Sequence, residues 1–162
     1  MADLITAASH SQAYKLERLL QSADIVFADH QELPRLAYPG RKLMKIPESN
    51  SPSYAHEMLD LALNYGITRI FPLYAGEILP LSEARQLFAE YAISVIVPSV
   101  LWVKKYIEFI RSSQSGEVVV LENGQVVAGE LPTHILLPEP DMTGIFLIQE
   151  EHQGPAFRLL TI

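Results

Sequence analysis

The chain has 162 residues, of which 49% are hydrophobic and 19% charged, and its formal net charge is −7. This composition is that of a globular domain and argues against intrinsic disorder. Cysteine is absent, which excludes disulfides, thiolate metal sites and cysteine nucleophiles. The first residues lack the basic leader of a signal peptide, and no apolar run approaches the roughly 20 residues of a membrane span. We therefore expect a soluble cytoplasmic protein.

The negative charge is unevenly distributed along the chain. Residues 1–112 contain 11 Lys and Arg against 12 Asp and Glu, whereas residues 113–162 contain only Arg158 against seven acidic residues. Such an acidic region repels phosphate backbones, so we predict no nucleic-acid partner. It either faces a basic partner or solvates an exposed β surface.

The first part of the chain alternates between apolar strands and amphipathic helices. Five strands are predicted, of which the first two are expected to be buried, at Leu4–Ala8, Asp24–Ala28, Lys42–Ile46, Ile67–Leu73 and Ile93–Pro98. Helical periodicity predicts a helix from Ser11, with Ala13, Leu16 and Leu20 on one face. Residues 29–41 form a polar connection between the second and third strands.

Three further helices are expected. Ser51 and Pro52 have the residue types of an N-cap and a first helical position, and that helix ends at Gly66. A loop through Gly76 and Glu77 leads to the next helix. Ser99 caps the last one, whose apolar face carries Val103, Tyr106, Ile107 and Ile110.

Apolar strands alternating with helices predict an α/β fold, with an open parallel sheet covered by helices on both faces. Right-handed crossovers favour the strand order 3-2-1-4-5. Residues 1–112 are expected to form this α/β domain.

Beyond Ser112 the pattern changes to short antiparallel strands. Asn123-Gly124 between two β-branched runs predicts a hairpin. We expect residues 113–162 to form a small β extension that packs on the α/β body or pairs across a homodimer. Its predicted strands are Val118–Leu121, Gln125–Ala128, Ile135–Leu137, Ile145–Gln149 and Phe157–Ile162.

A site is expected where the strand order reverses, because ligands bind there beyond the carboxyl ends of parallel strands. This switch point lies between strands one and four. The turns around it supply six candidate ligand-binding residues: Ser9, His10, Ser11, Gln12, Asp29 and Glu77.

The turn after the first strand contains no glycine, so the pyrophosphate of NAD or FAD fits poorly. A single phosphate or carboxylate remains possible at the helix N-terminus, with the hydroxyls of Ser9 and Ser11 as donors. Alternatively, one of these serines simply caps the helix.

The two acidic candidates each have two interpretations. Asp29 occupies the position of a ribose-binding acid in nucleotide folds, or it is a turn-forming aspartate. Glu77 orients a substrate amine or serves as a base, or it is a solvated residue in the loop or at the start of the helix.

Other chemistry has little support. The five histidines are scattered, and no metal, P-loop or serine-elbow motif is present, so we predict neither a metal site nor a cofactor. A basic cluster around Tyr38–Gly40 either contacts an anion or forms a solvated loop; it comprises Arg35, Arg41, Lys42 and Lys45.

The order of several segments resembles the N-terminal domain of ATP-grasp enzymes, in particular the carbamoyl-phosphate synthase large-subunit-like group. The resemblance covers about residues 3–110. Its segments are Leu4–Gln12, Phe27-Ala28-Asp29, Tyr38-Pro39-Gly40-Arg41, Ile67–Pro72 with Glu77, and Ala92–Ser99, where the family has glycine in place of Ala92.

This resemblance implies a Rossmann-like pre-ATP-grasp fold that helps to hold the non-nucleotide substrate. In that family ATP and magnesium bind to later lobes, and residues 113–162 contain no counterpart of their ATP-gripping lysines. We therefore expect no ligase activity from this chain alone.

Three functions are compatible with the sequence. The first is a stand-alone pre-ATP-grasp-like domain that binds a small anionic metabolite or serves a separate ATP-grasp subunit. The second is an interaction protein that dimerises through its acidic β region. The third is a small enzyme that uses Glu77 and His10 as acid and base.

Overall fold

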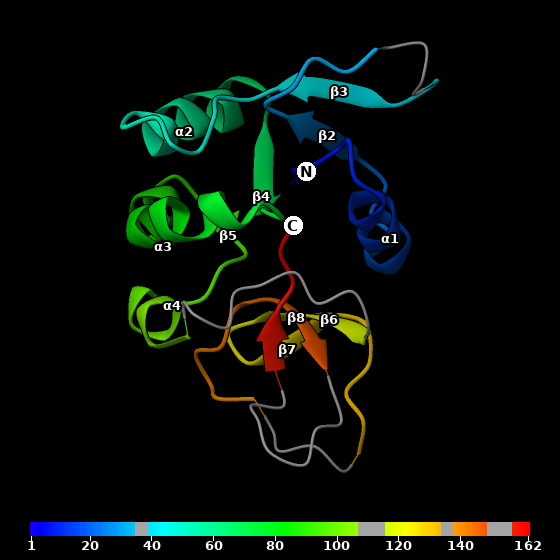
Figure 1. Cartoon of the computed structure of the whole chain (residues 1–162), viewed down its shortest axis with the longest axis vertical. Helices are drawn as coiled ribbons and strands as arrows, with labels where there is room; N and C mark the ends of the chain where they lie inside the picture. The colour runs from blue at the N-terminus through cyan, green and yellow to red at the C-terminus, as the bar shows by residue number, and fades with distance from the viewer. Residues whose placement is uncertain (35–38, 107–115, 134–137, 149–156) are drawn as a thin grey trace.

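The computed structural model describes residues 1–34, 39–106, 116–133, 138–148 and 157–162, which form two β-sheets and four helices (Figure 1). The first sheet is parallel throughout and has the order β3-β2-β1-β4-β5. This confirms the predicted α/β class and strand order. Its strands are β1 (Ala2–Ile5), β2 (Ile25–Asp29), β3 (Lys42–Lys45), β4 (Ile67–Phe71) and β5 (Ser94–Val95).

Helices cover both faces of this sheet, which makes the fold Rossmann-like. Figure 1 shows α1 on one side and α2 and α3 on the other. Successive strand residues alternate between the faces: Leu4 belongs to the same buried cluster as Met58 of α2, and Ile5 to the cluster of Leu16 of α1. The helices are α1 (Ser11–Leu20), α2 (Tyr54–Asn64), α3 (Ala75–Glu90) and α4 (Val100–Tyr106).

Two predicted helix starts have different outcomes. The start at Ser51-Pro52 is wrong, because these residues form a turn in which the Tyr54 N–H binds the Ser51 carbonyl, and α2 begins only at Tyr54. Ser99 does cap α4, since its hydroxyl accepts the Trp102 N–H at 3.3 Å. The predicted face of that helix continues to Ile107 and Ile110, which lie outside the described residues.

The second sheet is antiparallel, with the order β7-β6-β8-β9. Its hairpin turn is the predicted one: Asn123 and Gly124 have φ values of 51° and 73°, as a two-residue type I′ turn requires. The strand expected at Ile135–Leu137 lies outside the described residues. The strands are β6 (Glu117–Glu122), β7 (Gln125–Ala128), β8 (Gly144–Ile148) and β9 (Phe157–Leu159).

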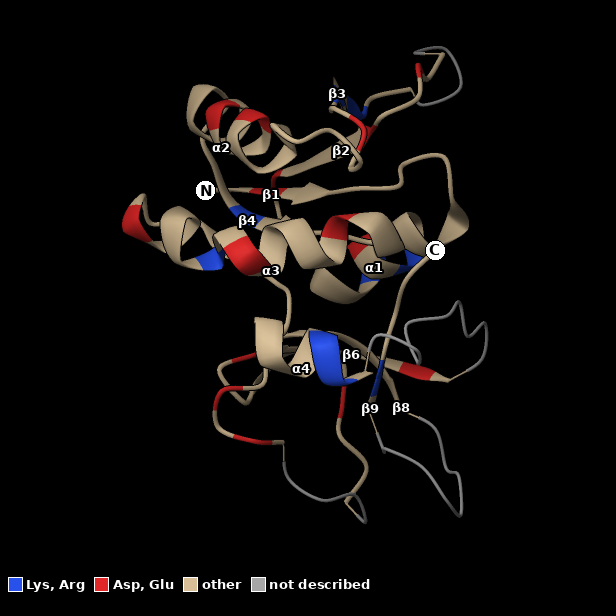
Figure 2. Cartoon of the chain, turned by 60° about the vertical axis from the view of Figure 1, so that its left-hand side comes forward, with Lys and Arg blue, Asp and Glu red and all other residues tan. Residues whose placement is uncertain are grey.

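The second sheet shares its core with the first. Phe146 of β8 lies in one buried cluster with Val95 of β5, and Ile145 lies in the other with Phe71 of β4. The described acidic residues of this region lie at its strand ends and in its loops, away from that core, as Figure 2 shows in red.

The last residues of the chain run from the second sheet back to the first. Leu160 N–H binds the Ile145 carbonyl at 2.8 Å, and Ile162 N–H binds the Leu73 carbonyl at 2.7 Å. The Ile162 carbonyl then accepts the Ala75 N–H at 3.1 Å. Residues 160–162 therefore lie beside the turn that follows β4.

None of the helices in the described part of the chain combines the length and the apolar character that a membrane crossing requires.

Strands β1 and β4, which flank the switch point, are joined by an ion pair whose carboxylate is buried and whose guanidinium is half-buried. The Arg69 guanidinium donates to both oxygens of Asp3, at 2.7 and 2.6 Å, and Asp3 is 1% exposed. We expect Arg69→Met to lower the free energy of unfolding by about 1–3 kcal/mol, because it leaves a buried carboxylate without donors.

Lys42→Met is the matched control, since the Lys42–Asp24 pair also joins neighbouring strands, from β3 to the residue before β2, but is solvent-exposed. Its cost should stay below about 1 kcal/mol. Urea denaturation of both variants measures the difference, and equal losses would contradict the role given to the Arg69–Asp3 pair.

Candidate functional site

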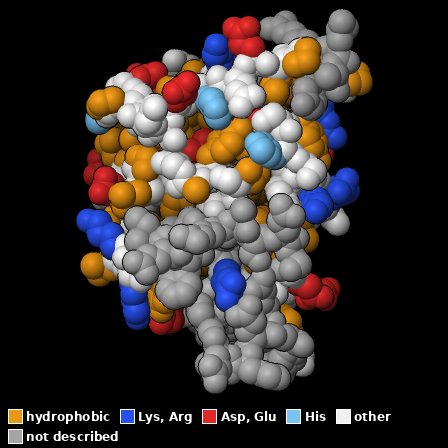
Figure 3. All heavy atoms as spheres, in the orientation of Figure 1, with side chains coloured by type: hydrophobic (Ala, Val, Ile, Leu, Met, Phe, Trp, Pro, Cys, Tyr) orange, Lys and Arg blue, Asp and Glu red, His pale blue; other side chains and the backbone are white. Residues whose placement is uncertain are grey.

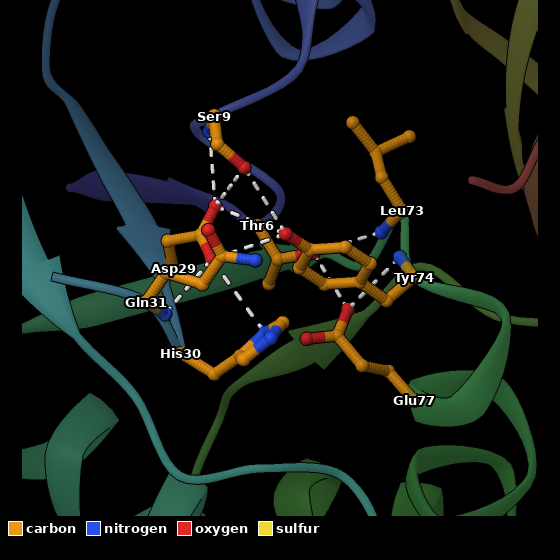
Figure 4. A network of polar contacts seen from close by, with 8 residues as sticks. All are labelled: Thr6, Ser9, Asp29, His30, Gln31, Leu73, Tyr74 and Glu77. Atoms are coloured by element: carbon orange, nitrogen blue, oxygen red, sulfur yellow. Dashed lines mark hydrogen bonds and ion pairs between the residues drawn. The ribbon is translucent and has the colours of Figure 1, made fainter. Parts of the chain in front are cut away.

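The turns after β1, β2 and β4 meet at the carboxylate of Asp29 (Figure 4). Asp29 is the last residue of β2 and is fully buried. One oxygen accepts the Ser9 N–H at 2.9 Å and the Ser9 hydroxyl at 2.8 Å, and the other accepts the Gln31 N–H at 3.0 Å. The Tyr74 hydroxyl lies 3.0 and 3.1 Å from the two oxygens.

These donors keep Asp29 ionised. Burial raises the pKa of the carboxyl, but the hydrogen bonds from Gln31, Ser9 and Tyr74 outweigh burial and hold the pKa below its usual value. Because its oxygens are already engaged, Asp29 has little capacity left for a ribose hydroxyl. The Asp29 carboxylate also occupies the N–H and hydroxyl of Ser9, which are donors that a bound phosphate or carboxylate would need.

Glu77 is the second buried acid of the site. The structure places it in the first turn of α3, which begins at Ala75, and not in the expected loop. It is 2% exposed. The Thr6 hydroxyl donates to its Oε2 at 2.6 Å, and the Tyr74 N–H donates to the same oxygen at 3.3 Å. Thr6 is itself oriented by the Leu73 N–H, which donates to its hydroxyl at 2.8 Å.

Burial raises the pKa of Glu77 to about 7, although the hydrogen bonds from Thr6 and Tyr74 and the nearby Tyr54 hydroxyl lower it, and the charge of Asp29 adds to the rise. The Tyr54 hydroxyl, buried beneath, has no partner in hydrogen-bonding geometry among the described residues, yet it lies near enough to influence Glu77. Glu77 is therefore an acid that exchanges its proton near neutral pH.

Tyr74 links the two acids and carries a histidine on each side. The rings of His10 and His30 lie 5.7 and 4.9 Å from its ring, both edge-on. Burial raises the pKa of the Tyr74 hydroxyl to about 12, so it remains a donor at neutral pH. Histidine side chains reach the surface beside apolar ones on the face shown in Figure 3.

The remaining predicted residues are placed differently. His10, not a serine, is the N-cap of α1, and its side chain makes no cap hydrogen bond. The alternative in which Ser9 or Ser11 caps the helix is therefore wrong, because Ser9 is engaged by Asp29 and Tyr74 and Ser11 is already helical. Ser11 is exposed, Gln12 is half-buried, and neither joins the polar network.

A pocket of about 300 Å³ opens beside this network, between the β4 turn and the loop that precedes α2. Three other described pockets have similar volumes, but none is lined by a buried charged side chain. The residues lining the pocket of the site are His30, Glu48, Ser49, Asn50, Tyr74, Ala75, Gly76, Glu77 and Ile162.

The basic cluster does not extend this site. Arg41 pairs with Glu17, and Lys42 and Lys45 pair with Asp24 and Glu32, so three of the four cations have partners within the chain. The fourth, Arg35, lies outside the described residues. No group of three or more potential metal ligands is found in the described part of the chain.

The six predicted residues leave out several members of the site, among them Thr6, Tyr54 and Ile162. Thr6 was hidden within the apolar run Leu4–Ala8, where a lone polar residue is the only signal. Tyr54 lies four residues before Met58, on the buried stripe of α2, and could have been included in it. No local sequence pattern indicates that Ile162 lies beside Leu73.

Comparison with protein-family models gives no match, and comparison with curated proteins gives no significant relative. The resemblance to ATP-grasp enzymes therefore stays a prediction.

The raised pKa of Glu77 makes stability depend on pH. The unfolded glutamate has a pKa near 4.5, so the stability gained by burying the neutral acid is fully present below pH 4.5 and is lost as pH rises to about 7. Relative to Glu77→Gln, the wild-type protein should lose on the order of 3 kcal/mol over this interval. Urea unfolding of both proteins at several pH values tests this. If their free energies of unfolding change with pH in parallel, the pKa of Glu77 is not raised.

Replacing Asp29 by asparagine should be costly at any pH above 5. The amide nitrogen would face donors, leaving at least one of the Ser9, Gln31 or Tyr74 groups unpaired, at a cost of about 1–3 kcal/mol. Asp24→Asn, at a 40% exposed side chain, should cost less than about 1 kcal/mol. Thermal unfolding distinguishes the two variants.

Proposed function

We propose that this chain is a pre-ATP-grasp-like domain that binds a small polar metabolite in the pocket beside Glu77. The observation that carries the proposal is the meeting of three strand-end turns around a buried, titratable carboxylate that lines a pocket. Perturbed acids in clefts mark functional sites more often than chance, and the carboxyl ends of a parallel sheet are where ligands bind.

The family resemblance supports the same reading of the site. The segments Phe27-Ala28-Asp29 and Ile67–Pro72 with Glu77, on which the resemblance rests, supply the two acids and the strands that present them. A domain of this kind holds the substrate while another protein lobe binds ATP. A separate ATP-grasp subunit is accordingly part of the proposal, as is a cytoplasmic location.

The alternatives have less support from the site. His10 and Glu77 make no contact with each other in the described structure, so an acid–base pair is not assembled there. Dimerisation through the second sheet stays a prediction.

A thermal-shift screen tests the proposal. The panel contains ATP, NAD, amino acids, amines, phosphate and phosphorylated metabolites. A bound ligand at about 100 times its Kd should raise Tm by about 5–10 °C for a domain of this size. The shift should disappear in Glu77→Gln and persist in Glu83→Gln, which changes an exposed acid on the same helix. A panel without any Glu77-dependent shift would overturn the proposal.

A further inference from the structure

Glu77 lines the pocket, and one of its two carboxylate oxygens, Oε1, has no hydrogen bond to any described residue. Both donors to this side chain, the Thr6 hydroxyl and the Tyr74 N–H, bind Oε2. In Figure 4 the other oxygen points away from these donors, toward the side on which His30 lies. Burying a carboxylate with half of its acceptors unused is unfavourable, so this oxygen is suited to accept a donor from a ligand.

The charge around that oxygen is negative. Asp29 is ionised and acts electrostatically on Glu77, and Glu48 lies on the exposed rim of the same pocket. The described lining contains no lysine or arginine, and His30 is the only basic side chain in it. A second anion would be repelled here, whereas a cation would restore the missing charge balance.

We infer that the pocket binds a small molecule through a protonated amine, with the ammonium group donating a hydrogen bond to Oε1 of Glu77. This inference rests on the proposed function and specifies its ligand. The pocket volume of about 300 Å³ limits the ligand to the size of an amino acid or a short amine. Gly76 and Ser49 in the lining lie close together, since a Cβ on Gly76 would be 2.5 Å from the Ser49 hydroxyl oxygen.

Binding of an ammonium must release a proton. Because the pKa of Glu77 is raised to about 7, its side chain carries a proton for part of the time at neutral pH, whereas the ammonium binds the ionised form. Affinity should therefore rise with pH below about 7 and level off above it. Asp29 of β2, Tyr54 of α2 and Tyr74 of the β4 turn act on the pKa of Glu77, and the other titratable side chains that line the pocket are His30 and Glu48.

The test uses matched pairs of compounds and isothermal titration calorimetry on the whole chain. The amines are ethanolamine, putrescine, glycinamide and small neutral amino acids, and the partners are ethylene glycol, 1,4-butanediol, glycolamide and the corresponding 2-hydroxy acids. Titrations at pH 6, 7 and 8 in two buffers of different ionisation enthalpy report both the affinity and the number of protons released.

We expect at least one amine to bind more tightly than its oxygen partner and to release a fraction of a proton at pH 7. Glu77→Gln should weaken that binding about 10- to 100-fold and remove its pH dependence, whereas Glu83→Gln should change neither. Tyr54→Phe provides a second variant that keeps the carboxylate. Because the tyrosine hydroxyl lowers the pKa of Glu77, its loss should move the pH midpoint upward.

Three results would overturn the inference, and they separate it from the proposed function. If an uncharged or anionic compound binds in a Glu77-dependent way and the amines do not, the ligand class is wrong but the site stands. If no compound in this or the wider panel binds, the proposed function fails as well. If amines bind equally well to Glu77→Gln, the amine site lies elsewhere.

Discussion

The site depends on one carboxylate, that of Asp29, which collects donors from three separate turns. Ser9 follows β1, Gln31 follows β2, and Tyr74 follows β4, and all of them converge on the same two oxygens. A neutral side chain of this shape could not accept so many hydrogen bonds. The ionised state of Asp29 therefore fixes the position of Tyr74, and the Tyr74 backbone in turn orients Glu77.

The two buried acids show how environment separates chemically similar groups. Asp29 is saturated with donors and stays ionised, whereas Glu77 receives two donors on one oxygen and titrates near neutrality. The first has a structural role, because its capacity is used within the protein. Glu77 keeps one oxygen that can still accept a hydrogen bond and it lines a pocket, so it is suited to recognise a ligand.

The features of the fold that depend on local sequence patterns could be predicted from the sequence. Apolar runs alternating with helices lead to the order β3-β2-β1-β4-β5, and Asn123-Gly124 leads to the hairpin. The site is only partly predictable: its place at the switch point and the acids Asp29 and Glu77 follow from topology. The contacts of Thr6 with Glu77 and of Tyr74 with Asp29 span 71 and 45 residues, and no periodicity encodes such pairs.

Ile162 forms part of the pocket wall, its backbone is hydrogen-bonded to Leu73 and Ala75, and it lies shortly after the end of β9. The position of this part of the pocket wall consequently depends on β8 and β9 remaining folded. A substitution deep in the second sheet, at Phe146 for example, is expected to loosen the pocket without touching any residue that contacts a ligand. Substitutions in the second sheet are therefore limited by the need to keep the pocket at the edge of the first sheet intact.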